Sequence, residues 1–211
     1  MSPETLVTRA SAVGLDGVAV TDHNTMAAVE PARRAATDLL VIPGEEIDTP
    51  DGQIIGLFLT EPIEPWQSPA AVIDAIHAQG GLALAPHPFD PLREGLASIG
   101  DHADALDAIE GRNSRCLRDR YNDRAVAFAR EHDLPITGGS DAHFAREVGT
   151  AFTRASLDAD PDTELSGDAV QRTIERGKVE PAGRRGTPLV HAGTKCVKLY
   201  DRVRRAIGRE Q

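Results

Sequence analysis

The five residues Gly139-Ser140-Asp141-Ala142-His143 (GSDAH) are the most informative stretch of this sequence. They follow residues 134–138, a short run whose composition predicts a buried strand. Asp141 and His143 lie one residue apart directly behind that strand. Carboxylate and imidazole are ligands that divalent zinc, manganese and iron share. The stretch therefore predicts a pair of metal ligands at the end of a strand.

Four more runs of small and apolar residues end in the same way, on residues that can bind a metal or a phosphate. These runs, with the residues that end them, are Val18 to Val20 with Asp22 and His23, Leu39 to Ile42 with Glu46, Leu82 to Ala85 with His87, and Leu106 to Ile109 with Glu110 and Asn113. In barrels of alternating strands and helices the catalytic residues lie at the C-terminal ends of the strands. Five strands that end on such residues are expected to bring them together, which favours a metalloenzyme.

Segments with helical patterning alternate with these strands. Helices are expected after Ser2 and over residues 25–38, 68–79 and 115–132. The turn Asp51-Gly52 predicts that residues 53–59 form the hairpin partner of the strand at 39–42. The alternation predicts an α/β fold with a parallel sheet, and small buried strands with polar trailing loops favour a barrel over an open sheet.

The run Asp158 to Gly167 is rich in Asp and Pro and predicts a boundary. We therefore divide the chain into a metal-binding barrel domain, residues 1–157, and a C-terminal segment, residues 158–211. Helices are expected near Asp168 to Arg176 and over Val197 to Ile207 in the second part.

Charge is unevenly spread along the chain. The formal net charge is −10, yet residues 172–211 carry eleven Lys and Arg against four Asp and Glu. This basic tail is either a solvated helical face or a docking surface for a phosphate-bearing substrate. No run approaches the roughly 20 apolar residues of a membrane span, and the first residues do not resemble a secretory signal. A cytoplasmic protein with no membrane partner is expected.

The expected ligands are five: His23, Glu46, His87, Asp141 and His143. Glu46 is the candidate bridge between metals, because a carboxylate has two donor oxygens. A metal lowers the pKa of bound water and stabilises charge on a phosphoryl oxygen, so no side-chain nucleophile is required; Glu46, Asp141 and His143 are the expected catalytic residues. Arg112, Asn113 and Arg115 lie near the same rim, where the arginines either clamp a substrate phosphate or pair with surface acids.

Five motifs in this order resemble the polymerase and histidinol phosphatase (PHP) family. They are Gly14 to Thr25 (GLDGVAVTDHNT), Pro43 to Ile47 (PGEEI), Ala83 to Phe89 (ALAPHPF), Ile109 to Ser114 (IEGRNS) and Gly138 to His143 (GGSDAH). The resemblance covers about residues 2–155. The residues after Gly149 resemble the short C-terminal segment associated with one branch of this family.

The resemblance implies a distorted (β/α)7 TIM-like barrel that holds up to three divalent metals (Zn, Mn or Fe) and hydrolyses phosphoesters. His23, Glu46, His87, Asp141 and His143 match the family's ligand positions, and Asn113 matches a more variable one. Glu45 is left out, because the family's ligand stands two residues after Gly44. The branch looks closest to 5′–3′ exonucleases and nucleotide phosphatases, which implies a phosphorylated small molecule or a nucleic acid end as substrate.

The family begins with a strand carrying a His-x-His pair, and this sequence begins at the helix that follows it. The barrel is therefore expected to lack its first strand and at least two ligands, and to hold one or two metals. A start assigned too late is favoured over a degenerate homologue, because the other ligands are intact. Three alternatives stay open: a non-catalytic module that binds metal or a phosphorylated ligand, a histidinol-phosphatase-like phosphatase, and a metal-dependent amide hydrolase.

Overall fold

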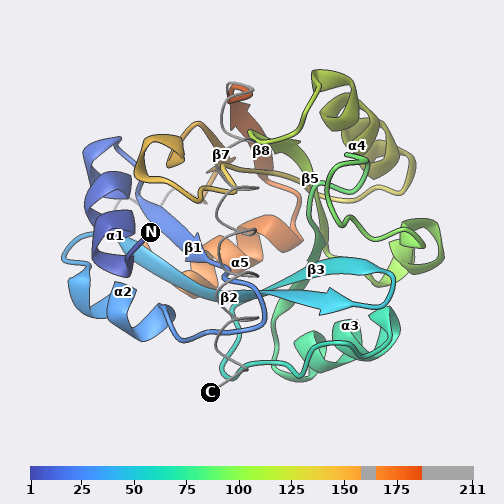
Figure 1. Ribbon diagram of the computed structural model, residues 1–211, viewed down its shortest axis with the longest axis horizontal. Helices are drawn as coiled ribbons and strands as arrows, with labels where there is room; N and C mark the ends of the chain where they lie inside the picture. Colours follow the sequence, from blue (N-terminus) through green and yellow to red (C-terminus); the bar gives the residue numbers. More distant parts are fainter. Residues whose placement is uncertain (158–164, 187–211) are drawn as a thin grey trace, which may run out of the picture.

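The computed structural model describes residues 1–157 and 165–186 and has a mixed α/β fold (Figure 1). A curled sheet of six strands has the order β1-β2-β3-β4-β5-β6. Its strands are β1 (Gly17–Val20), β2 (Leu40–Thr49), β3 (Gly52–Leu57), β4 (Leu82–Ala85), β5 (Ala108–Asn113) and β6 (Ile136–Gly139). The helices are α1 (Pro3–Ala12), α2 (Val29–Ala35), α3 (Pro69–Ala78), α4 (Asp119–Glu131) and α5 (Gly167–Glu175), with short 3₁₀ segments η1 (Ile99–Ala105) and η2 (Ala145–Glu147).

The six-stranded sheet is mixed: the expected parallel sheet is interrupted by the hairpin strand β3. Strand β3 runs antiparallel to both β2 and β4, whereas β1-β2, β4-β5 and β5-β6 are parallel pairs. Only Pro50 and Asp51 separate β2 from β3. Two residues cannot form the crossover that a parallel pair needs, so the strands must form a hairpin. The predicted hairpin is thus confirmed.

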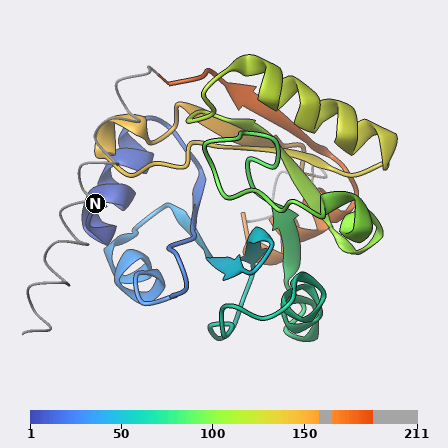
Figure 2. The same cartoon turned by 45° about the vertical axis from the view of Figure 1, so that its right-hand side comes forward.

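Helices pack around the outside of this sheet (Figures 1 and 2). Helices α1 and α2 lie side by side near β1 and β2, while α3 and α4 lie near the other strands. Ser2, Ser68 and Ser166 cap α1, α3 and α5, each accepting a hydrogen bond from the backbone N–H three residues later. Helix α2 begins at Val29, four residues later than expected; Pro31 has no N–H to donate and is best placed in a first turn.

A second sheet pairs strand β7 (Ala151–Ala155) antiparallel with β8 (Val179–Gly183). The Thr153 hydroxyl accepts from the Gly138 N–H at 2.9 Å, which ties β7 to β6. The C-terminal segment therefore supplies a strand that pairs with one from the predicted barrel domain. The expected helix over 197–207 lies outside the described residues.

The main core lies between the sheet and helices α3 and α4. All four residues of β4 are buried, and Ile47, Ile54, Ile73, Ile76 and Ile109 are at most 1% exposed. This packing holds the ends of β2, β4 and β5 in fixed positions. No helix in the described parts of the chain is both long and apolar enough to cross a bilayer.

Candidate metal centre

Two imidazoles each lie near a different oxygen of the Glu46 carboxylate. His23 Nε2 lies 3.3 Å from Glu46 Oε2, and His87 Nε2 lies 3.2 Å from Glu46 Oε1. His23 and His87 follow the ends of β1 and β4, whereas Glu46 lies within β2, three residues before its end, because β2 runs further than the expected strand at 39–42. His87 and Glu46 are buried, whereas the His23 side chain is 37% exposed. The arrangement places one carboxylate between a buried imidazole and a partly exposed one.

The backbone around Glu46 explains why it, and not its neighbour Glu45, faces these histidines. A bridge pairs His23 with Glu46, the Asn24 N–H donates to the Glu46 carbonyl at 3.0 Å, and the Glu46 N–H donates to the Asp22 carbonyl at 3.1 Å. Successive side chains of a strand point to opposite faces. Glu45 accordingly turns away, and its Oε2 accepts from the Ile63 N–H at 2.8 Å.

A second group of polar side chains lies beside His87. Asn113 Nδ2 donates both to Glu110 Oε2 at 2.9 Å and to Asp141 Oδ2 at 3.1 Å. Glu110 Oε2 also accepts from the His87 N–H at 2.8 Å. The ends of β4, β5 and β6 are thereby linked, and Asp141 is brought to the same place as Glu46 and His87. Gly139 permits this contact, because a Cβ there would lie 2.4 Å from Glu110 Oε1.

Arg93 is a member of the site that the sequence patterns did not predict. Its Nη2 lies 2.6 Å from Asp141 Oδ2, its side chain is 15% exposed, and its charge interacts with Glu46 and Glu110 as well. Arg93 follows His87 by six residues in an irregular loop, so no strand or helix pattern points to it. The only available signal is the presence of one arginine in the loop that follows a candidate ligand histidine.

His143 lies at the edge of this group. Its Nδ1 is 3.0 Å from the Asp141 carbonyl and 3.5 Å from Asp141 Oδ1, so it approaches Asp141 but contacts neither Glu46 nor His87. The His143 N–H donates to Glu147 Oε2 at 2.9 Å. Four of the five expected ligands therefore lie in one network, and His143 is joined to it through Asp141.

The three expected phosphate contacts occupy different environments. Asn113 is buried between Glu110 and Asp141. Arg115 is 2% exposed, and its guanidinium pairs with Glu147 at 2.8 Å inside the protein. Arg112 is half-buried on β5, opposite Gly138 of β6. Arg115 thus contacts a carboxylate that also holds the His143 backbone.

The electrostatics of the site keep Glu46 ionised. Burial acts to raise the pKa of Glu46, but the hydrogen bond and charge of His87, together with His23 and Arg93, hold that pKa below its ordinary value. Burial acts to lower the pKa of His87, and the hydrogen bond with Glu46 overcomes it and raises that pKa. Burial raises the pKa of Glu110 to about 7. A metal bound at Glu46 and His87 would therefore compete with a proton on His87.

Three residues in or next to the site have an unfavourable backbone conformation. Asn24, His87 and Asp141 have φ angles of 54°, 32° and 50°, in the left-handed region that non-glycine residues rarely adopt. Such conformations cost free energy and persist where the surroundings enforce them, most often at functional sites. The strain indicates that the positions of His87 and Asp141 are imposed by the fold.

The donor set fits a divalent metal by its chemistry. Imidazole nitrogens and carboxylate oxygens are the ligands of zinc, manganese and iron, and the buried His87 Nδ1 has no hydrogen-bond partner. Within the described residues, however, no group of three or more His, Cys, Asp or Glu side chains is already arranged to hold an ion. The donors contact one another and Arg93 instead, so binding requires these contacts to open.

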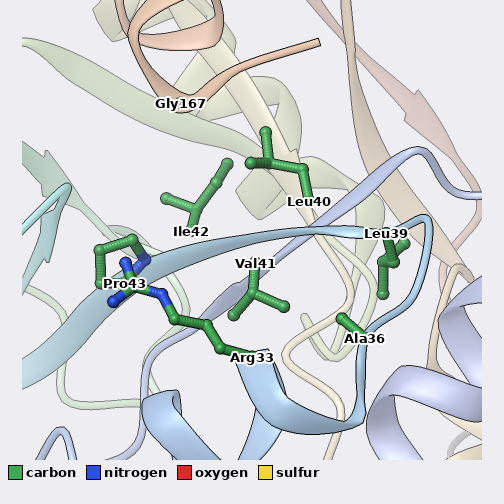
Figure 3. Close-up of a pocket in the computed structure, with 8 residues that line it drawn as sticks. All are labelled: Arg33, Ala36, Leu39, Leu40, Val41, Ile42, Pro43 and Gly167. Carbon is green, nitrogen blue, oxygen red and sulfur yellow. The ribbon is translucent and has the colours of Figure 1, made fainter.

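A separate cavity of about 360 Å³ lies between α2, β2 and the start of α5 (Figure 3). It is lined by Arg33, Ala36, Gly167 and residues 39–43, none of which is a candidate ligand. The cavity is therefore distinct from the metal centre.

Sequence comparison finds one matching family model and a related protein of known sequence. A family model described as PHP-associated matches residues 119–179. An uncharacterized protein of Methanocaldococcus jannaschii is 36% identical over 155 residues, which is 70% of this chain and 62% of that protein. The match thus spans about three fifths of the length of the relative.

Structural comparison finds the same fold in larger proteins. A two-domain protein of Bacteroides vulgatus containing a predicted PHP-like metal-dependent phosphoesterase matches with a TM-score of 0.69 and 18% identity, over 86% of this chain and 60% of that one. Endonuclease Q, in complex with a 27-mer duplex with an abasic lesion at the active site, matches with a TM-score of 0.63 and 14% identity, over 88% and 55%.

Proposed function

The chain belongs to the PHP family, and we propose that it is a metal-dependent phosphoesterase that acts on nucleotides or on the 5′ ends of nucleic acids. The observation that carries the proposal is the carboxylate of Glu46, held between His23 and His87 beside Asp141 and Arg93. The DNA complex of the structural neighbour Endonuclease Q supports a nucleic acid or nucleotide substrate.

In this proposal His23, Glu46 and His87 hold one divalent metal, and Asp141 and His143 contribute to a second position. A bound metal supplies Lewis acidity and a water of lowered pKa. The ionised state of Glu46 suits it to this role, because its pKa is held below the ordinary value before any metal arrives. Asn113 orients Asp141 by donating to its carboxylate.

Arg93 binds the substrate phosphate in this proposal. Its guanidinium has a planar arrangement of donors that fits two phosphate oxygens. In the free protein this guanidinium is paired with the Asp141 carboxylate. A metal at Asp141 would free Arg93 for the substrate. Arg115 acts from inside the protein, because Glu147 links it to the His143 backbone.

A test compares two histidines that each pair with a carboxylate. His87→Gln removes a site imidazole, whereas His77→Gln removes one whose Nε2 lies 2.8 Å from Asp107 Oδ2 outside the site. We expect manganese-dependent phosphate release from nucleotides and short oligomers to fall at least about 100-fold, or about 2.7 kcal/mol, in His87→Gln only. Equal activity in the two variants, or no release from any substrate by the parent protein, would count against the proposal.

The position of Arg93 favours a second candidate function, a module that binds a phosphorylated ligand without hydrolysing it. Its guanidinium already offsets the negative charge of the carboxylates that a metal would otherwise neutralise. The two candidates differ in one measurement. A module binds nucleotide equally well in chelator and in manganese and releases no phosphate, whereas the enzyme turns it over only with metal.

A further inference from the structure

Trp66 is exposed to solvent, and its backbone has a conformation that is unfavourable for a bulky residue. The residue is 66% exposed and its φ is 67°, in the left-handed region. A bulky side chain at such a φ is an outlier, because its Cβ crowds the backbone, and glycine would adopt the same conformation freely. Neither packing nor backbone preference therefore accounts for a tryptophan at this position.

The loop that carries Trp66 is attached to the strand of the candidate metal centre. The Trp66 N–H donates to the Asp48 carbonyl at 2.7 Å. Asp48 stands two residues after Glu46 on β2, about 7 Å further along the strand. Gln67 Nε2 donates to the Glu64 carbonyl at 2.9 Å and closes the turn around Trp66. The backbone of Trp66 is thus held beside the site.

The side chain of Asp48 joins this loop to a ligand histidine. Its Oδ2 accepts from Asn24 Nδ2 at 2.6 Å, and its Oδ1 accepts from Gln53 Nε2 at 2.8 Å. Gln53 Nε2 in turn lies 3.3 Å from His23 Nδ1. The Trp66 loop and the most exposed ligand of the site therefore share one hydrogen-bonded network.

We propose that Trp66 is a stacking platform for the nucleobase of a substrate whose phosphate binds at Arg93 and the metal centre. The inference rests on the proposed function and adds the part of the substrate that is recognised away from the phosphate. An indole offers a flat apolar face, and every base has a π-face, so such stacking accepts different bases. A backbone held by a closed turn loses little conformational freedom on binding.

The test uses the fact that Trp66 is the only tryptophan of the chain, so its fluorescence reports on this ring alone. The full chain with Mg²⁺ is titrated with uridine monophosphate, and in parallel with ribose 5-phosphate, which has the phosphate but no base. We expect saturable quenching by the nucleotide and none by the sugar phosphate. Identical responses to the two ligands would overturn the inference.

Variants at the same position separate stacking from folding. We expect Trp66→Gly to raise the KM for uridine monophosphate about tenfold, because the stacking surface is lost. Trp66→Phe, which keeps an aromatic ring, should leave this KM within about threefold of the parent value. Neither variant should change the KM for ribose 5-phosphate. Trp66→Gly should also raise Tm, because it relieves the backbone conformation. An unchanged nucleotide KM in Trp66→Gly overturns the inference while leaving the phosphoesterase intact. Quenching by nucleotide without any phosphate release supports base binding and counts against the proposed hydrolysis.

Discussion

Arg93 and Asp141 form an ion pair in the middle of the candidate metal centre, with Nη2 2.6 Å from Oδ2. The guanidinium is largely buried and also interacts with the charges of Glu46 and Glu110. One protein cation therefore offsets the carboxylates that would ligate a metal. In the proposed site a metal and Arg93 would compete for Asp141, and this competition makes the site testable from two directions.

Replacing the guanidinium should strengthen metal binding. In Arg93→Met the competitor for Asp141 is lost, so we expect the Kd for Mn²⁺ to fall about tenfold, or about 1.4 kcal/mol, by isothermal titration calorimetry. The KM for a phosphoester should rise in the same variant, because a phosphate contact is lost. Arg154→Met is the control, since Arg154 pairs with Glu180 on an exposed strand. Weaker Mn²⁺ binding in Arg93→Met would contradict the competition.

Replacing the carboxylate should weaken metal binding. Asp141→Asn removes an anionic ligand, so the metal content measured by elemental analysis should fall, and activity with it. Folding should change little, because asparagine tolerates the left-handed φ of 50° at this position and can still accept from Asn113. Asp107→Asn, which alters the carboxylate paired with His77, is the matched control. A full metal complement in Asp141→Asn would show that Asp141 is no ligand.

Features that depend on residues close together in the sequence could be predicted, whereas those that depend on distant residues could not. The start of helix α3 at Ser68, the turn between β2 and β3 and strand β4 depend on neighbouring residues, and each was predicted close to its observed position. The ligand positions were accessible because strand ends converge in this class of fold. The length of β2, which runs to Thr49, was not predicted, because its last residues are defined by pairing with β3.

The contacts of arginines could not be predicted from the sequence for a physical reason. Arg115 is buried against Glu147, 32 residues away, and Arg93 pairs with Asp141, 48 residues away. No local periodicity encodes which carboxylate such a side chain will meet. Sequence spacing therefore pointed to the candidate ligands but did not identify the cation among them.

The buried pair of Arg115 and Glu147 should matter far more for stability than a surface pair of the same kind. Glu147→Gln leaves a buried guanidinium without its carboxylate, and we expect a loss of about 3 kcal/mol or more in the free energy of unfolding by urea denaturation. Glu180→Gln breaks the exposed pair with Arg154 and should cost less than about 1 kcal/mol. Similar losses in the two variants would mean that the pair is not insulated from water.

Cys116 should be chemically inert in the folded protein. Burial, followed by the charges of Glu110 and Asp90, raises the pKa of this thiol far above its usual range. The reactive thiolate is therefore scarce at neutral pH, and the sulfur is also shielded, with Cys116 2% exposed. In a Cys196→Ser background, Ellman's reagent should label Cys116 only after denaturant is added. Rapid labelling of the native protein would contradict this placement.

The most direct test of the metal centre compares two adjacent glutamates that point to opposite faces of β2. Glu46→Gln removes the carboxylate between His23 and His87, while Glu45→Gln changes one that accepts from the Ile63 N–H instead. Calorimetric titration of both variants with Mn²⁺ should show affinity reduced at least about 100-fold in Glu46→Gln and unchanged in Glu45→Gln. Parental affinity in Glu46→Gln would refute the claim that this carboxylate holds the metal.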